Sequence, residues 1–238
     1  MQHKTILITG GTSGIGLELV KLLAPTNRIV FCARNADMVA KTQKEIPNTL
    51  GITADIQSDN DVKKLYHQIN ERYGMLNVLM ANAGVANFVD YNDPLPSNSL
   101  IDMDINFGGT VKLINQFLPL LRSSENPAVI LTSSILAKVP VHSMPIYSAS
   151  KAALHSYSQS LRAQLPFLRV VEVLPPLVDT PLAAAIKTND KLSPKAVAQK
   201  IIGDFEKGKT EIYPGRAVIA NFMSRLAPKK IEKMLNSL

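Results

Sequence analysis

Short runs of apolar and β-branched residues alternate along this chain with longer segments whose apolar residues recur at helical spacing. Several of the short runs, including VLMANAG and AVILTSS, are almost continuously apolar, which is typical of strands in a parallel sheet that helices cover on both faces. The alternation predicts an α/β fold built on a doubly wound parallel sheet. We expect seven strands, at Thr5–Thr9, Arg28–Cys32, Thr49–Ala54, Leu76–Ala81, Ala128–Thr132, Leu168–Leu174 and Thr210–Tyr213.

The composition fits a single domain. The chain has 238 residues, of which 46% are hydrophobic and 19% charged, and no repeat or long Pro/Gly/Ser linker divides it. Its one cysteine, Cys32, cannot form an internal disulfide, and the start of the chain lacks a signal-peptide layout. No apolar stretch approaches the roughly 18 residues of a membrane-spanning helix. We therefore expect one domain of the Rossmann type, located in the cytoplasm.

The formal charge of +7 is concentrated near the end of the chain. Residues 1–186 contain 15 Lys and Arg against 14 Asp and Glu, whereas residues 187–238 contain 11 against 5. A basic surface there would suit an acidic carrier protein, an anionic lipid surface or nucleic acid, and scattered solvated lysines would give the same count. Basic composition alone does not indicate nucleic-acid binding, so we predict none, and we predict no metal site.

The first predicted strand leads into a glycine-rich turn and an amphipathic helix, in the segment ILITGGTSGIGLELVKLLA. Glycines allow a backbone to approach a ligand closely, and a helix start directs free N–H groups and a positive dipole end at phosphates. The spacing of Gly10, Gly14 and Gly16 differs from G-x-G-x-x-G, and glycines here would also serve a simple tight turn. Their position after the first strand favours a dinucleotide pyrophosphate site.

The residues after the second strand indicate which dinucleotide would bind. An acidic residue there would bind the ribose 2′-OH of NAD, but this chain has Arg34 and Asn35. A guanidinium binds a 2′-phosphate through two hydrogen bonds, so we predict a preference for NADP(H), with NAD(H) as the alternative. Arg34 would otherwise be an ordinary surface cation, and Asp37 is expected to support the first turn of the next helix.

Two further segments lie at the carboxyl ends of predicted strands, where ligands bind in such sheets. Asp55, after the third strand, would accept a hydrogen bond from the adenine amino group or else cap the next helix. The sequence ANAG, residues 81–84, has small side chains that leave room for a nucleoside.

Tyr147 and Lys151 are four positions apart in a predicted helix, so their side chains lie on one face. A free phenol has a pKa near ~10 and is a poor acid–base catalyst at neutral pH, but a neighbouring ammonium favours the phenolate and lowers that pKa. A tyrosine and a lysine at this spacing are also common on ordinary surface helices. Whether the two residues form a catalytic pair or an ordinary surface pair therefore depends on the surrounding sequence.

Ser134 ends the fifth predicted strand, 13 residues before Tyr147, and the loop between them can fold back to the same edge of the sheet. Its hydroxyl could donate to a substrate carbonyl oxygen beside the tyrosine. Ser133 lies one residue earlier in the strand and should point to the opposite face. A serine nucleophile is not indicated, because neither serine lies in G-x-S-x-G and neither His142 nor His155 has an evident acidic partner.

Four motifs occur in order along the chain: TGGTSGIG at 9–16, ANAG at 81–84, a serine 13 positions before the tyrosine, and YSASK at 147–151. With this combination the chain resembles the single-domain branch of the short-chain dehydrogenase/reductase family, over residues 4–213. The resemblance implies that Tyr147 exchanges a proton with the substrate oxygen, that Ser134 holds this oxygen, and that Lys151 binds the nicotinamide ribose and tunes the tyrosine. It also implies that Asn106 positions a water molecule for proton relay.

The family pattern extends the expected cofactor site beyond the glycine loop. The full predicted set is Gly10, Thr12, Ser13, Gly14, Ile15, Gly16, Arg34, Asn35, Asp55, Ile56, Asn82, Ala83, Gly84, Tyr147, Lys151, Pro175, Val178 and Thr180. Two positions depart from the family. Its usual Pro-Gly is Pro175-Pro176 here, so a flexible residue beside the nicotinamide becomes one with a fixed φ and no N–H donor. The first asparagine of its usual NNAG is Ala81.

The resemblance places substrate residues in the loops ILAKVPVHSMPI and LVDTPLAAAIK, which are mostly apolar and contain no arginine cluster for a carboxylate or phosphate. We therefore expect an NADP(H)-dependent oxidoreductase that acts on the carbonyl or alcohol carbon of an apolar ketone, aldehyde or alcohol. Two alternatives stay open. One is a sensor or scaffold that binds NADP(H) without turnover, and the other is a reductase of ketoacyl groups on an acidic carrier protein.

The sequence after residue 214 predicts two short amphipathic helices. They would pack on the core, close the substrate mouth, form a dimer contact or lie on an anionic membrane surface. We therefore expect residues 1–214 to form the dinucleotide-binding and catalytic part, and residues 215–238 to form a basic helical extension of the same domain. The family resemblance also implies a homodimer or homotetramer joined through long helices.

Overall fold

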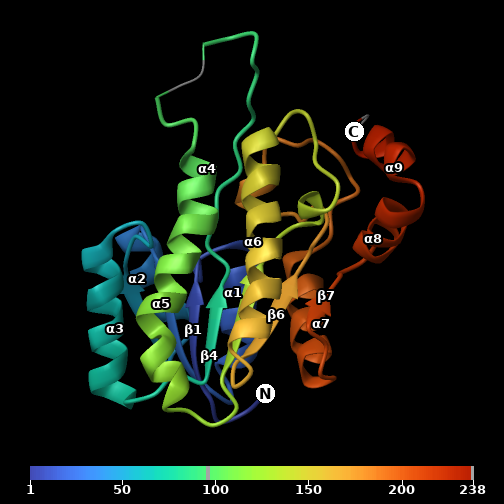
Figure 1. The fold of residues 1–238 in the computed structure, drawn as a ribbon. Helices are drawn as coiled ribbons and strands as arrows, with labels where there is room; N and C mark the ends of the chain where they lie inside the picture. The colour runs from blue at the N-terminus through green and yellow to red at the C-terminus, as the bar shows by residue number, and fades with distance from the viewer. Residues whose placement is uncertain (95–96, 237–238) are drawn as a thin grey trace.

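The computed structural model of the chain describes residues 1–94 and 97–236. In this part of the chain, seven parallel strands form one sheet in the order β3-β2-β1-β4-β5-β6-β7 (Figure 1). The order reverses between β1 and β4, which confirms the predicted doubly wound fold. Each strand overlaps one of the predicted runs: β1 (Thr5–Thr9), β2 (Arg28–Ala33), β3 (Thr49–Thr53), β4 (Val78–Ala81), β5 (Ala128–Thr132), β6 (Arg169–Val173) and β7 (Glu211–Ile212).

Successive residues of a strand point to opposite faces of the sheet, and each face packs against its own set of helices. The helices are α1 (Gly14–Leu23), α2 (Ala36–Glu45), α3 (Asp59–Tyr73), α5 (Thr110–Arg122), α6 (Pro145–Gln164) and α7 (Pro194–Glu206). Leu7 of β1 belongs to the apolar core under α3, α5 and α6, whereas its neighbours Ile6 and Ile8 belong to the core under α1, α2 and α7. Burial on both faces explains why the strands are almost continuously apolar.

The helical segment after β4 is irregular. A single turn, α4 (Ile101–Met103), leads into a π-helical segment, η1 (Asp104–Gly109), before α5 begins. Within it Asn106 is completely buried, and its carbonyl oxygen accepts a hydrogen bond from Thr110 Oγ1 at 2.7 Å. Such π-helical insertions occur frequently at functional sites.

Two short 3-10 turns follow the carboxyl ends of β5 and β6, namely η2 (Ile135–Ala137) and η3 (Pro181–Ala183). The chain continues past β7 into α8 (Ala217–Leu226) and α9 (Pro228–Leu235), the two short helices that the sequence predicts, which lie at the side of the molecule (Figure 1). Within the described ranges, none of the helices has the length and apolar character needed to cross a bilayer.

Candidate active site

Tyr147 and Lys151 lie in the first two turns of α6, which begins at Pro145. Proline is favoured at the first helical position because its missing N–H would have no partner there. Lys151 Nζ lies 5.5 Å from the centre of the Tyr147 ring and donates to the carbonyl oxygen of Thr132 at 2.9 Å. Since Thr132 is the last residue of β5, this bond holds the lysine at the carboxyl edge of the sheet.

Ser134 follows β5 and begins η2, where its Oγ accepts a hydrogen bond from Leu136 N at 3.1 Å. The same hydroxyl group interacts with the Tyr147 side chain and favours its phenolate form. The Ser133 hydroxyl instead donates to the carbonyl oxygen of Lys151 at 3.2 Å. The structure therefore brings Ser134, rather than Ser133, to the tyrosine hydroxyl, as the strand alternation predicts.

Burial controls the acid–base properties of this group. It raises the pKa of Tyr147 to about 12, and the neighbouring Ser134 hydroxyl opposes only part of that shift. It lowers the pKa of Lys151 to about 8, against smaller opposite effects of the Asp102 and Glu172 carboxylates. We expected the lysine to lower the pKa of the tyrosine. The net shift is upward because a buried phenolate loses its hydration.

Asn106 is fully buried, and both ends of its side-chain amide bind protein groups. Oδ1 accepts from Val85 N at 2.9 Å, and Nδ2 donates to Val85 O at 2.9 Å and to Ser150 Oγ at 3.0 Å. The amide thus ties the segment after β4 to α6, one residue before Lys151. A Cβ at Gly84 would lie 2.8 Å from Asn106 Oδ1 and 3.6 Å from Lys151 Nζ, so glycine keeps this space open.

The glycine loop between β1 and α1 is closely packed. Gly10 and Gly14 have φ angles of 68° and 53°, a region that favours glycine. A Cβ at Gly16 would lie 2.1 Å from the carbonyl oxygen of Gly10, and one at Gly14 would lie 2.8 Å from Thr180 Cγ2. The structure therefore packs Gly14 against Thr180, the residue directly before η3, and both belong to the predicted cofactor site.

Thr9 connects the glycine loop to the segment after β4. Its Oγ1 accepts hydrogen bonds from the backbone N–H groups of Asn82 and Ala83, both at 3.0 Å. Asn82 Nδ2 donates to Thr9 O at 3.2 Å, and Asn82 Oδ1 accepts from Thr132 Oγ1 at 3.3 Å. These bonds link β1, β4 and β5 at the point where the strand order reverses, which is where ligands bind in doubly wound sheets.

The residues after β2 and β3 do not all behave as predicted. Arg34 is exposed, but the side chain of Asn35 caps α2, where its Oδ1 accepts a backbone N–H at 2.9 Å. Asp55 Oδ1 accepts a backbone N–H two residues further on, at 2.9 Å, and the cap of α3 is Ser58. The alternative in which Asp55 caps the helix is therefore wrong, whereas Asp37 does lie in the first turn of α2.

The other predicted cofactor residues follow the ends of β1, β3 and β6. Ser13 precedes α1, and its side chain makes no capping hydrogen bond. The carbonyl oxygen of Pro175 accepts from Ile135 N at 3.0 Å, which links the loops after β5 and β6. Of the remaining predicted residues, Thr12 is half-buried, and three are apolar and buried: Ile15, Ile56 and Val178.

Comparison with known proteins identifies the family of this chain. A family model described as short chain dehydrogenase matches residues 4–191. This chain belongs to the short chain dehydrogenase family. The uncharacterized oxidoreductase DltE of Bacillus subtilis (strain 168) is 35% identical over 225 residues, which cover 89% of this chain and 88% of that protein. The 11-beta-hydroxysteroid dehydrogenase-like 3 protein of Arabidopsis thaliana is 35% identical over 188 residues, which cover 75% of this chain and 60% of that protein.

Solved structures share the fold. A short chain dehydrogenase from Burkholderia cenocepacia J2315 in complex with NADP matches with a TM-score of 0.87 and 24% identity, over 98% of both chains. A short chain dehydrogenase/reductase from Burkholderia phymatum in complex with NAD matches with a TM-score of 0.87 and 21% identity, over 98% of this chain and 95% of that one. The family and the fold inferred from the four sequence motifs are confirmed.

The protein also has a partly buried polar network one helical turn beyond Lys151. His155 Nδ1 lies 2.7 Å from Glu172 Oε2, and His155 Nε2 lies 2.6 Å from Lys138 Nζ. Glu172 is completely buried, and within the described residues its Oε1 has no hydrogen-bond partner. The expectation that His155 lacks an acidic partner is therefore wrong. The carboxylate comes from β6, 17 residues further along the chain, where spacing does not reveal it.

The network is charge-paired. His155, Glu172 and Glu211 place ligand atoms within 4.8 Å of one another, which would suit a metal ion. Two cations already share the cluster, the Lys138 ammonium beside His155 and the Arg162 guanidinium 3.9 Å from Glu211. An imidazole that donates from Nδ1 to the carboxylate can accept at Nε2 both from the ammonium and from the Gln159 amide, which lies 3.0 Å away. Because Lys138 directly follows η2, the network ties the η2 turn to α6 and β6.

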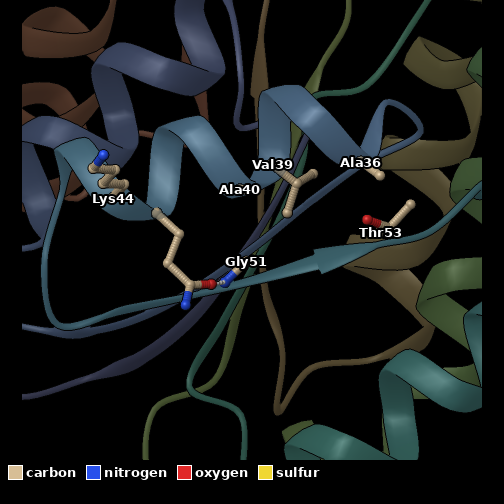
Figure 2. A pocket seen from close by; sticks show the side chains of 7 residues that line it. Ala36, Val39, Ala40, Lys44, Gly51 and Thr53 are labelled. Atoms are coloured by element: carbon tan, nitrogen blue, oxygen red, sulfur yellow. Dashed lines mark hydrogen bonds between the residues drawn. The ribbon is translucent and has the colours of Figure 1, made fainter.

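In the described part of the chain, cavities lie near both edges of the sheet. One, of about 470 Å³, lies between α2 and the edge strand β3 (Figure 2), where Gln43 Oε1 accepts from Gly51 N at 2.7 Å. It contains none of the residues gathered around Tyr147, so we do not assign it to the site. The other, of about 710 Å³, lies between α9 and the start of α6, and its wall includes Leu136, Val141, Ala149, Lys229 and Lys233.

Proposed function

We propose that this protein is an NADP(H)-dependent oxidoreductase that moves a hydride between the nicotinamide and the carbonyl or alcohol carbon of a mostly apolar substrate. The observation that carries the proposal is the buried group at the start of α6, in which Lys151 Nζ lies 5.5 Å from the Tyr147 ring and Ser134 interacts with the phenol. A protein that only binds a nucleotide has no need for a buried phenol beside a buried ammonium, since burying such groups is costly.

The residues of the chain fit a dinucleotide. At Gly10 and Gly14 the backbone is bare and tightly turned, and Ser13 makes no side-chain capping bond at the start of α1, which suits a phosphate there. Gly84 keeps open the space beside Lys151 Nζ, where a ribose hydroxyl would bind. When bound, the nicotinamide supplies or accepts the hydride.

The proton chemistry is assigned to Tyr147. Its phenol would give a proton to the substrate oxygen during reduction and take it back during oxidation. Ser134 would donate to the same oxygen and stabilise negative charge as it develops. Lys151 would favour the phenolate that forms. Because both ends of the Asn106 amide already bind protein groups, we assign this residue to positioning α6 rather than to holding a water molecule with its side chain.

The preference for NADP(H) rests on Arg34, which is exposed directly after β2. A guanidinium in that position can bind a 2′-phosphate through two hydrogen bonds. The two solved structures of similar fold contain NADP in one case and NAD in the other, so NAD(H) is the alternative.

An apolar substrate is supported by the surroundings of Tyr147. The tyrosine belongs to a buried cluster with Val141 and Met144, against which other apolar side chains pack, namely Ala86, Leu136, Ile186 and Leu235. A substrate carbonyl that reached the phenol would therefore be surrounded mainly by hydrocarbon. We propose a ketone or aldehyde with apolar substituents, or the corresponding alcohol.

The proposal includes assembly and location. We include a homodimer or homotetramer joined through long helices, as the family resemblance implies. The single cysteine, Cys32, is free and buried, which is compatible with a reducing cytoplasm.

The test is a titration of the protein with NADPH and with NADH, followed by a panel of apolar ketones and aldehydes while the absorbance of the reduced nicotinamide is recorded. We expect tighter binding of NADPH and its oxidation by at least one compound. Tyr147→Phe should keep NADPH binding and lower turnover by at least about 100-fold. Tyr157→Phe, on the same helix, is the matched control and should leave turnover unchanged.

Two outcomes would contradict the proposal. Turnover near that of the wild type in Tyr147→Phe would remove the phenol from the mechanism. Failure to bind either nucleotide would refute the assignment of the glycine loop as a cofactor site.

A further inference from the structure

Helix α8 exposes its apolar side chains to water. Four of its five large hydrophobic residues have high exposed fractions: Val218 54%, Ile219 58%, Phe222 62% and Leu226 69%. The residues on its other side are buried or half-buried, and apart from Met223 they are small or polar: Ala217, Ala220, Asn221 and Ser224. A surface helix normally buries its large apolar residues and exposes the polar ones. In α8 this arrangement is reversed.

The exposed residues form one continuous face. Positions 218, 219, 222 and 226 recur at helical spacing, with Arg225 among them. Single exposed apolar residues need no explanation, but four on one face of a helix of 10 residues indicate a contact surface. The inner side of α8 does not make up for this exposure with polar contacts of its own. In the described part of the chain, the buried Asn221 Oδ1 has no hydrogen-bond partner.

Positive charge lies on the same helix and on the neighbouring helix α9. Residues 214–238 contain five Lys and Arg and one Glu, so +4 of the chain's +7 lies in this segment. Helix α9 packs against α8, and the two lie together at the side of the molecule (Figure 1). The cations Arg225, Lys229, Lys230 and Lys233 are all exposed. The two helices together therefore expose both apolar side chains and cations.

We propose that the outward face of α8 and the lysines of α9 dock on an anionic phospholipid surface. Acyl chains would bury the apolar side chains, while the lipid phosphates would bind the cations. A second copy of this chain fits the surface less well. A two-fold contact would set the same cations against themselves, and Glu232 is the one acidic residue of the segment.

Docking would bring the membrane beside the candidate active site. Leu235 of α9 packs against the cluster that contains Tyr147, and Asn236 Oδ1 accepts from His142 N at 2.7 Å. The cavity of about 710 Å³ lies between α9 and the start of α6, with Lys229 and Lys233 in its wall. An apolar substrate dissolved in the bilayer would enter next to the tyrosine. This consequence rests on the proposed function, whereas the docking itself does not.

The test is co-sedimentation of the full chain with vesicles of phosphatidylcholine alone, or of phosphatidylcholine and phosphatidylglycerol in equal amounts. We expect binding to the anionic vesicles that weakens as salt is added. The triple variant Lys229→Gln/Lys230→Gln/Lys233→Gln should weaken binding by about 100-fold, because each cation near such a surface contributes somewhat less than a factor of ten.

A second variant tests the apolar face. Phe222→Ser/Leu226→Ser should weaken vesicle binding by at least about tenfold, and since both residues are exposed the fold should persist, as checked by circular dichroism. The matched control is Leu100→Ser, which changes an exposed leucine (61%) outside the surface and should bind as the wild type does.

Three outcomes would overturn the proposal: no binding to either vesicle, equal binding to both, or unchanged binding of the double variant. If vesicles fail to bind and the double variant changes the molecular mass measured by light scattering, the occupant is a second copy. If an acidic carrier protein binds instead, the occupant is that protein. NADPH affinity and turnover of a water-soluble ketone are measured on the same samples without vesicles, so their failure would count against the proposed function alone.

Discussion

Two alanine substitutions in helices test the glycine loop against its own internal control. Gly16 lies in α1 and Gly203 in α7, so alanine should favour the helical backbone at both positions by about 0.5–1 kcal/mol. Their surroundings differ. A Cβ at Gly203 would meet no atom within 4 Å, whereas one at Gly16 would lie 2.1 Å from the carbonyl oxygen of Gly10 and 2.7 Å from Asn82 Nδ2.

The two distances decide the sign of each effect. Gly203→Ala should stabilise the protein by about 0.5–1 kcal/mol and raise Tm by about 1–4 °C. At Gly16 the backbone would have to open by roughly 1 Å to reach normal van der Waals contact, and overpacking of this kind costs about 1–3 kcal/mol or more. After subtraction of the helical gain, we expect a net destabilisation of about 1–2 kcal/mol and a fall in Tm of about 2–8 °C.

The affinity for NADPH should fall with stability in Gly16→Ala, by at least about tenfold, because a shift of this size displaces the phosphate-binding backbone. Calorimetry of the wild type and both variants, with fluorescence titration of NADPH, measures both effects. If Gly16→Ala were as stable as Gly203→Ala and bound NADPH like the wild type, the close packing at Gly10 and its assignment to the cofactor would be refuted. A loss of stability in Gly203→Ala would refute the helix-propensity part of the reasoning.

Three other substitutions test the site. Arg34→Ala should weaken NADPH binding at least about tenfold and leave NADH binding nearly unchanged, and equal losses in titrations with both would exclude this arginine as the phosphate-binding residue. Glu172→Gln removes a carboxylate that raises the pKa of Lys151, so this pKa should fall below about 8. As the pH is raised, the variant should therefore lose the turnover that needs the ammonium at a lower pH than the wild type does. Superimposable pH profiles of kcat would contradict this. Gly84→Ala should lower turnover, because its Cβ would lie 2.8 Å from Asn106 Oδ1, and a fully active variant would show that the space is not needed.

The parts of the site that the sequence predicts are those that depend on local geometry or on the parallel sheet. Tyr147 and Lys151 share a face because they are one helical turn apart. Ser134 joins them because the carboxyl ends of parallel strands meet at one edge, and strand alternation separates it from Ser133. The glycine loop follows from its position between a strand and a helix.

The parts that escaped prediction depend on packing between distant elements. The bond between His155 and Glu172 forms because α6 packs over β6, which no spacing along the chain indicates. The one signal was the charge inside the apolar run RVVEVLPP, since a buried charge requires a partner. The rise in the pKa of Tyr147 depends on how deeply the phenol is buried, and the orientation of α8 depends on which of its sides meets the rest of the molecule.

The opposite pKa shifts of Tyr147 and Lys151 bear on the direction of the reaction. With a pKa of about 12 for the phenol and about 8 for the ammonium, both groups carry their protons at neutral pH. The phenol can then give its proton to an alkoxide as it forms, and the adjacent positive charge favours the resulting phenolate. Oxidation would instead have to begin from the phenolate, which the upward shift in pKa makes less accessible by about 3 kcal/mol. Burial of the phenol thus favours the protonated form, which is the form that gives a proton during reduction.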